Sequence, residues 1–175
     1  MNRKTFGAIL CLALTALLGA AEQNILKNGD FKSVAKNNVP TSWRLDGKKA
    51  AVTDNNGVKE FQAMPIFRHN SYFASLGQSL DLTAGKYKFS GEVKGKMTHI
   101  NLVVFCGNLK QKTTLRRVSF TGEMKDWKTF STEFTLSGDQ KRAGLTAVFY
   151  VPGEKDPVFI RNLKLQKIDK EQTKK

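Results

Sequence analysis

Apolar and polar residues alternate with a period of two along most of the chain. The pattern is clearest in residues 86–94, where Tyr87, Phe89 and Val93 lie on one side and lysine, serine and glutamate lie on the other. This period is typical of a β-strand with one face on a core and one in water. Residues 72–82 show a similar alternation, and a short turn that ends in a glycine joins the two stretches. The pair predicts a β-hairpin that anchors an antiparallel sheet.

Further strands are predicted wherever this pattern recurs between clusters of turn residues. They cover residues 43–46, 50–53, 58–63, 99–106, 114–121, 127–136, 143–151 and 157–168. Residues 64–70 are predicted as a loop and residues 122–126 as a turn, and a helical period persists nowhere over a dozen residues. About ten short strands without a helix predict an all-β, antiparallel β-sandwich.

The last predicted strand changes its phase in the middle. Ile160 and Leu163 are both apolar, although a strict period of two would place them on opposite faces. An extra residue in one strand of a pair has this effect, so we expect a β-bulge near Arg161 and Asn162.

Residues 1–21 have the composition of a targeting segment. A basic start precedes a mostly apolar run over residues 6–18, and small residues follow as far as Ala21. This order is typical of a secretory signal peptide, with an uncleaved membrane anchor as the alternative. We expect cleavage after Ala21, one β-sandwich domain over residues 22–168 and a polar tail over residues 169–175. The protein is then secreted, periplasmic or on the cell surface.

The charge of the chain is strongly positive. It contains 29 lysines and arginines against 15 aspartates and glutamates, a formal net charge of +14, and the lysines are scattered over every segment. For an exported protein this balance favours an anionic partner such as an acidic polysaccharide, whereas nucleic acid is not an expected partner outside the cell. The alternative is a solvated basic surface with no partner.

Signatures of catalysis are absent from the sequence. It has no G-x-S-x-G, P-loop or H-E-x-x-H motif, and Cys106 is the only cysteine after the expected leader, so no internal disulfide can form. His99 and Cys106 are seven residues apart in one predicted strand, which places them on opposite faces. We therefore expect a protein that is not an enzyme. A glycosidase pair of carboxylates, brought together only by folding, is the alternative.

Four segments together resemble a known class of protein. They are residues 24–31 with Pro40-Thr41-Ser42-Trp43 after them, residues 76–91, residues 127–134 and residues 158–165. In this order they look like the carbohydrate-binding modules of the family-four and family-nine type that accompany cellulases. The resemblance implies a galactose-binding-like β-jelly-roll with residues 76–91 as its central hairpin. It also implies non-catalytic binding of a carbohydrate or glycan.

The positive charge suggests an anionic polysaccharide as the ligand. The alternative is a structural or adhesive cell-surface protein that contacts another protein through the same sandwich.

The resemblance breaks down at the calcium site of the class. Its members often bind a structural calcium ion with one acidic residue soon after the opening Asn-Gly-x-Phe and another in the closing strand. Here Lys32 follows Phe31, and Arg161 occupies the acidic position of the closing strand. Calcium needs several oxygen ligands and is repelled by cations. We expect the site to be lost, with no metal or other cofactor.

Candidate sugar contacts lie on the outward positions of the predicted strands. Asn101, Phe105 and Tyr150 alternate with apolar core positions, and Arg117 is out of phase with its apolar neighbours. Aromatic rings stack on sugar rings, amides bond to hydroxyls, and an arginine suits a carboxylated or sulfated sugar. Tyr72 and Phe67, near loop edges, are further candidates for a binding site at the rim of the sandwich.

There is an alternative for these candidate residues. In it, the N-terminal segment or a long loop covers the outward face, and the candidates are packing residues that do not bind sugar. The tryptophans, Trp43 and Trp127, are expected in the core, Trp127 because it opens a strand beside Phe130 and Phe134.

Overall fold

The structure is all-β. The computed structural model describes residues 23–47, 49–68, 70–107, 112–153 and 156–168. The strands are β1 (Arg44–Asp46), β2 (Lys49–Asn55), β3 (Val58–Met64), β4 (Ile66–Arg68), β5 (Ser71–Leu82), β6 (Gly85–Gly107), β7 (Lys112–Leu136), β8 (Gln140–Val151) and β9 (Val158–Ile168). All strand pairs are antiparallel, which confirms the predicted fold class.

Two predicted segments lie outside the described residues, namely the leader over residues 1–21 and the tail over residues 169–175. Among the described residues, none forms a helix with the length and apolarity needed to cross a membrane.

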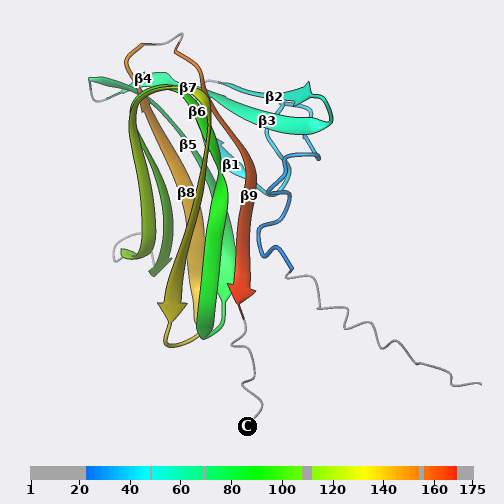
Figure 1. Cartoon of the computed structure of the whole chain (residues 1–175), viewed down its shortest axis with the longest axis vertical. Coiled ribbons are helices and arrows are strands. Elements are labelled where there is room, and N and C mark those ends of the chain that lie inside the picture. Colours follow the sequence, from blue (N-terminus) through cyan, green and yellow to red (C-terminus); the bar gives the residue numbers. More distant parts are fainter. Residues whose placement is uncertain (1–22, 48, 69, 108–111, 154–155, 169–175) are drawn as a thin grey trace, which may run out of the picture.

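One continuous sheet folds back on itself to make two layers. The front layer contains β1 and β4 beside β5, then β8, the second half of β6 and the first half of β7. The back layer contains β2, β3 and β9, followed by the first half of β6 and the second half of β7. In Figure 1, β6 and β7 arch over one end of the molecule and descend in both layers.

A bend in β6 moves this strand from the back layer to the front layer. Its buried residues have odd numbers up to Met97 and even numbers from Ile100 onward, and its register shifts in the same region. Gly95 has a φ of 127°, and a Cβ at this position would lie 2.1 Å from the carbonyl oxygen of Pro157. The bend therefore requires a glycine.

The predicted hairpin of residues 72–94 is wrong, although both of its strands exist. β5 pairs with β1, β4 and β8, and β6 pairs with β7, β8 and β9, so the two are not neighbours. The turn between them crosses from the front layer to the back layer, and Leu76 and Phe89 both point into the shared core with no exposed surface. Alternation shows which face of each strand is buried, but two strands facing each other across a core have the same pattern as two paired strands.

Longer strands replace several of the predicted short ones. The segments predicted at residues 86–94 and 99–106 are both parts of β6, and the predicted turn at residues 122–126 lies inside β7. The predicted loop at residues 64–70 contains the short strand β4. The predicted bulge in the last strand is confirmed, because Ser90 pairs with Lys164 whereas Glu92 pairs with Arg161, leaving one extra residue in β9.

The N-terminal segment closes one edge of the sandwich between the layers. Phe31 and Trp43 are buried beside Phe61 of the back layer. Gln78, the one buried polar residue recorded among the described residues, bonds to the backbone of Lys27 through both ends of its amide. Gln78 is in phase with the buried residues of β5, so the segment that it holds lies at the inner side of the front layer.

Candidate functional site

The outer surface of the front layer, here called the front face, brings together most of the predicted site residues. Its cross-strand rows follow from the register, and residues directly opposite one another share a face. One row contains Ser75, Val148, Asn101 and Ser119, and the next contains Arg44, Gly77, Thr146, Val103 and Arg117. Phe105 and Tyr150 lie on the same face in the flanking rows. Asn101, Phe105, Arg117 and Tyr150 therefore share one surface.

The front face is accessible to solvent. Asn101, Phe105 and Tyr150 are half-buried, Arg117 is exposed, and the Asn101 side-chain oxygen accepts a 2.7 Å hydrogen bond from the Ser119 hydroxyl. The described part of the N-terminal segment is held at the edge of the sandwich by the hydrogen bonds between Gln78 and Lys27.

A cleft of about 1350 Å³ opens beside the N-terminal segment, and its lining takes residues from the front face and also from the inner side of the front layer, such as Gln78 and Leu145. Phe105, Thr146 and Gly77 line it, together with residues of the N-terminal segment such as Trp43. The ring of Phe105 lies over Gly144 of the neighbouring strand, because a Cβ on Gly144 would come within 2.7 Å of the ring. An aromatic ring that lines a cleft beside small residues is suited to stacking on a ring-shaped ligand.

Cations predominate around the cleft. Lys27, Arg44 and Arg142 line it, whereas Asp81 is the one acidic residue among its described lining. Arg44 and Arg117 stand at the two ends of one row, separated by four strand spacings, or about 19 Å along the sheet. Positive charge therefore lies at both ends of this row.

Tyr72 does not lie on the front face. It is in phase with the buried Ala74 and Leu76 of β5, and its ring is 5.1 Å from that of Phe67. The two tyrosines Tyr72 and Tyr150 instead line a second, smaller pocket at the rim of the sandwich. The prediction placed Tyr72 at the rim, and the structure agrees with that position.

Sequence reasoning missed the arginines and glycines of the cleft. Arg44 lies in a strand of three residues, too short to show a period, and Arg142 precedes the apolar part of β8. Gly77 and Gly144 contribute by having no side chain, which is recognisable only when the neighbouring strands are known. The alternation in β8 places Arg142 on the same face as Tyr150, so the sequence alone could have identified Arg142 as a residue of this face.

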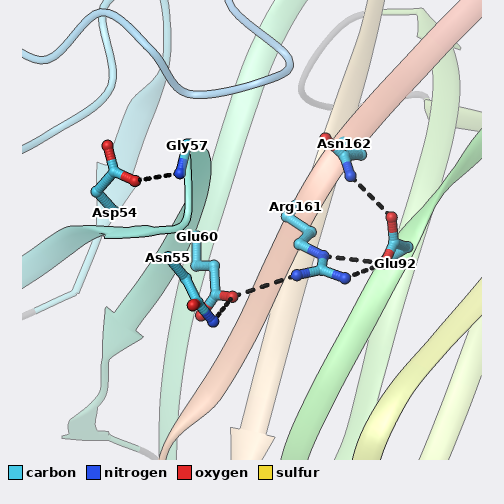
Figure 2. A network of polar contacts seen from close by, with 7 residues as sticks. All are labelled: Asp54, Asn55, Gly57, Glu60, Glu92, Arg161 and Asn162. Carbon is cyan, nitrogen blue, oxygen red and sulfur yellow. Dashed lines mark hydrogen bonds and ion pairs between the residues drawn. The ribbon is translucent and has the colours of Figure 1, made fainter.

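The outer surface of the back layer carries a network of polar contacts, shown in Figure 2. The Arg161 guanidinium donates hydrogen bonds of 2.9 and 2.7 Å to Glu92 and lies 3.3 Å from the Glu60 carboxylate. Asn162 donates to the other oxygen of Glu92 at 2.8 Å. Burial by itself raises the pKa of Glu92, but the hydrogen bonds from Asn162 and Arg161 outweigh it and hold this pKa below its ordinary value.

Trp127 belongs to this network, and its predicted place in the core is wrong. The guanidinium carbon of Arg161 is 4.0 Å from the centroid of its ring, and the ring is half-buried. The buried Phe130 and Phe134 have even numbers, so Trp127 points to the opposite side of β7. An arginine stacked on an indole gains a cation–π attraction that core packing does not provide.

No cluster of three or more His, Cys, Asp or Glu side chains that could hold a metal ion occurs in the part of the chain that the structure describes. Lys32 forms an ion pair with Asp30, and Arg161 is engaged by Glu60 and Glu92. The loss of the calcium site stays a prediction.

Comparison with known proteins finds similarity in structure and not in sequence. The sequence matches no protein-family model and no curated protein. A family-61 carbohydrate-binding module in complex with β-1,4-galactotriose has a TM-score of 0.61 at 20% identity, with 84% of this chain and 100% of that module covered.

Two further modules superpose in the same way. A family-4 carbohydrate-binding module gives a TM-score of 0.57 at 16% identity over 81% of this chain and 99% of its own. The xylan-binding family-22 module of Xyn10C from Paenibacillus barcinonensis gives 0.56 at 13% identity over 86% and 97%. The chain has the β-jelly-roll fold of these carbohydrate-binding modules.

Proposed function

We propose that the protein is an exported, non-catalytic module that binds a carbohydrate polymer on its front face. The observation that carries this proposal is the cleft, in which the half-buried ring of Phe105, with its tip over Gly144, forms an aromatic platform on the same face as Gly77. Sugar rings stack on such a platform, and hydroxyl and amide groups such as those of Thr146 and Asn101 bond to sugar hydroxyls. The similar modules support this role, since one is in complex with a galactotriose and another is named as xylan-binding.

The preferred ligand in this proposal is an acidic polysaccharide. Arg44, Arg142 and Lys27 at the cleft, and Arg117 at the far end of its row, favour carboxylate or sulfate groups. The spacing between Arg44 and Arg117 allows a chain that crosses the strands to meet a cation at both ends of the face. A neutral polymer gains the stacking on Phe105 but not these charge contacts.

The test measures binding to polygalacturonate and alginate against neutral β-1,4-galactan and xylan, at low and high salt. We expect tighter binding to the acidic polymers at low salt. High salt should weaken the charge contacts, because exposed charges are screened within about 8 Å already at physiological ionic strength, whereas the affinity that comes from stacking should remain. Phe105→Ala should weaken binding by about tenfold. Arg117→Ala should reduce the preference for the acidic polymers, whereas Lys164→Ala, an exposed cation of the back layer, is the charge-matched control.

The outcomes separate the alternatives. Binding that disappears entirely at high salt and is equally weakened by Lys164→Ala reports only general charge attraction and contradicts the site. Failure to retain any polysaccharide favours the alternative, a structural or adhesive protein that contacts another protein.

A further inference from the structure

A second pocket lies at the rim of the sandwich and is separate from the cleft. It has a volume of about 400 Å³ and is formed by β4, β5, β6 and β8 where these strands approach the rim. Tyr150 lines this pocket, whereas Thr146 lines the cleft. Tyr150 lies four positions after Thr146 in β8, which is about 13 Å of extended strand.

The rim pocket is lined by aromatic and neutral polar groups. The rings of His99 and Tyr150 are stacked with centroids 4.2 Å apart, and Tyr72 contacts Phe67 on the other side. The remaining lining residues are Asn70, Ser71, Thr98, Val151 and Pro152. No lysine, arginine, aspartate or glutamate occurs among the described residues that line it, in contrast to the cleft.

Phe67 is the most informative residue of the pocket. Its side chain is 63% exposed, which makes it the most exposed large hydrophobic residue recorded in the described part of the chain. A phenylalanine ring at the mouth of a pocket leaves apolar surface in water that a bound ligand would cover. Its neighbours Asn70, Ser71 and Thr98 supply amide and hydroxyl groups within the same pocket.

We propose that the rim pocket is a second carbohydrate site, which binds a neutral sugar unit of one or two residues independently of the cleft. The volume lies within the range of small-ligand sites, about 300–1000 Å³. Aromatic rings with neutral hydrogen-bonding groups suit the C–H face and hydroxyls of an uncharged pyranose. Among the described residues that line the pocket there is no arginine or lysine, so the proposed ligand is bound by ring stacking and neutral hydrogen bonds and not by the charge contacts proposed for the cleft.

The test follows backbone amide signals of the ¹⁵N-labelled protein while methyl β-galactopyranoside, methyl β-glucopyranoside and methyl β-xylopyranoside are added at millimolar concentrations. We expect at least one glycoside to shift the signals of Thr98, His99 and Val151 and to leave that of Thr146 unchanged. Phe67→Ala should weaken this binding by about tenfold. Thr98→Ala, at another exposed position, should weaken it as well, and both variants should fold because neither side chain is buried.

Phe105→Ala is the matched control, since Phe105 lines the cleft and not the rim pocket. This variant should bind the glycoside as the unmodified protein does, while losing affinity for polygalacturonate. The proposal is overturned if no glycoside shifts these signals, if shifts occur only around the cleft, or if Phe67→Ala leaves the affinity unchanged. Each of these results is independent of whether polygalacturonate binds.

Discussion

Two glycines shape the floor of the cleft on the front face. Gly144 makes room for the ring of Phe105, and Gly77 lies in the row between Arg44 and Thr146, with the Thr146 hydroxyl oxygen 3.5 Å from the position that a Cβ would take. A Cβ on Gly77 would meet the Leu145 carbonyl oxygen at 3.4 Å, an ordinary contact distance. Gly77 therefore tolerates a side chain sterically, and what a side chain would remove is open space in the cleft.

Gly77→Leu should block polysaccharide binding without unfolding the protein. The new side chain would point outward into the cleft and occupy the place of a sugar ring beside Phe105. We expect retention on polygalacturonate to fall by at least tenfold, with a melting temperature close to that of the unmodified protein.

Ser131→Leu is the control, because Ser131 is exposed on β7 in the back layer. Polysaccharide binding that survives Gly77→Leu would place the ligand elsewhere on the molecule.

Glu92 links the stability of the fold to pH. The pKa of Glu92 in the folded protein lies below the ordinary value of 4.5. The ionised carboxylate therefore adds to the free energy of unfolding fully above pH 4.5, and this stabilisation is lost as the pH falls through the pKa of the folded state. Glu92→Gln removes the charge that Arg161 and Asn162 bind. We expect this variant to be about 1 kcal/mol less stable at neutral pH, with a difference that shrinks below pH 4.5.

Thermal unfolding followed by circular dichroism over a pH series measures this difference. Glu133→Gln is the matched control, because the Glu133 carboxylate pairs with Lys86 but remains 47% exposed, so its loss should change stability little. A difference between the unmodified protein and Glu92→Gln that stays constant down to acid pH would contradict the role of the carboxylate.

Among the elements, β6 contains a bend that depends on the backbone conformation of Gly95. Gly95→Ala would combine a φ of 127° with a Cβ at 2.1 Å from the Pro157 carbonyl oxygen. We expect destabilisation of about 2–3 kcal/mol in urea unfolding, because strain and a backbone clash add at this bend.

Gly138→Ala provides the control, since a Cβ there meets nothing within 4 Å and the φ of Gly138 is not positive. Equal stability of the two variants would show that the bend in β6 relaxes easily.

The strands were predictable from the sequence, but their partners were not. Tyr87 and Leu76 each revealed a buried face through alternation, yet they lie in opposite layers. Pairing depends on contacts between residues far apart in the chain, such as Leu76 with Ala147, and local periodicity contains no information about them.

The same limit applies to the candidate site. Asn101 and Phe105 were placed on an outward face by alternation alone, and the structure has them there. Arg44 joins this face only through the pairing of β1 with β5. Trp127 was misplaced because its nearness to Phe130 and Phe134 was given more weight than its phase, which already puts it on the opposite face of the strand.

For the molecule as a whole, we predict that folding does not depend on calcium. Lys32 and Arg161 bring positive charge to positions where the resembled class has acidic residues, and Arg161 is already bound by Glu60 and Glu92. The melting temperature should be the same in calcium and in a chelator. A calcium-dependent rise in melting temperature would contradict this prediction.

Because β6 and β7 run through both layers, the sandwich has no boundary at which one layer can open and leave the other intact. The slowest-exchanging backbone amides of β5 in the front layer and of β9 in the back layer should then give the same free energy of opening in hydrogen exchange. A ligand that binds only the folded protein raises that free energy by mass action. If the protein binds polysaccharide on its front face as proposed, we expect exchange to slow in the back layer as well, although the ligand does not contact that layer.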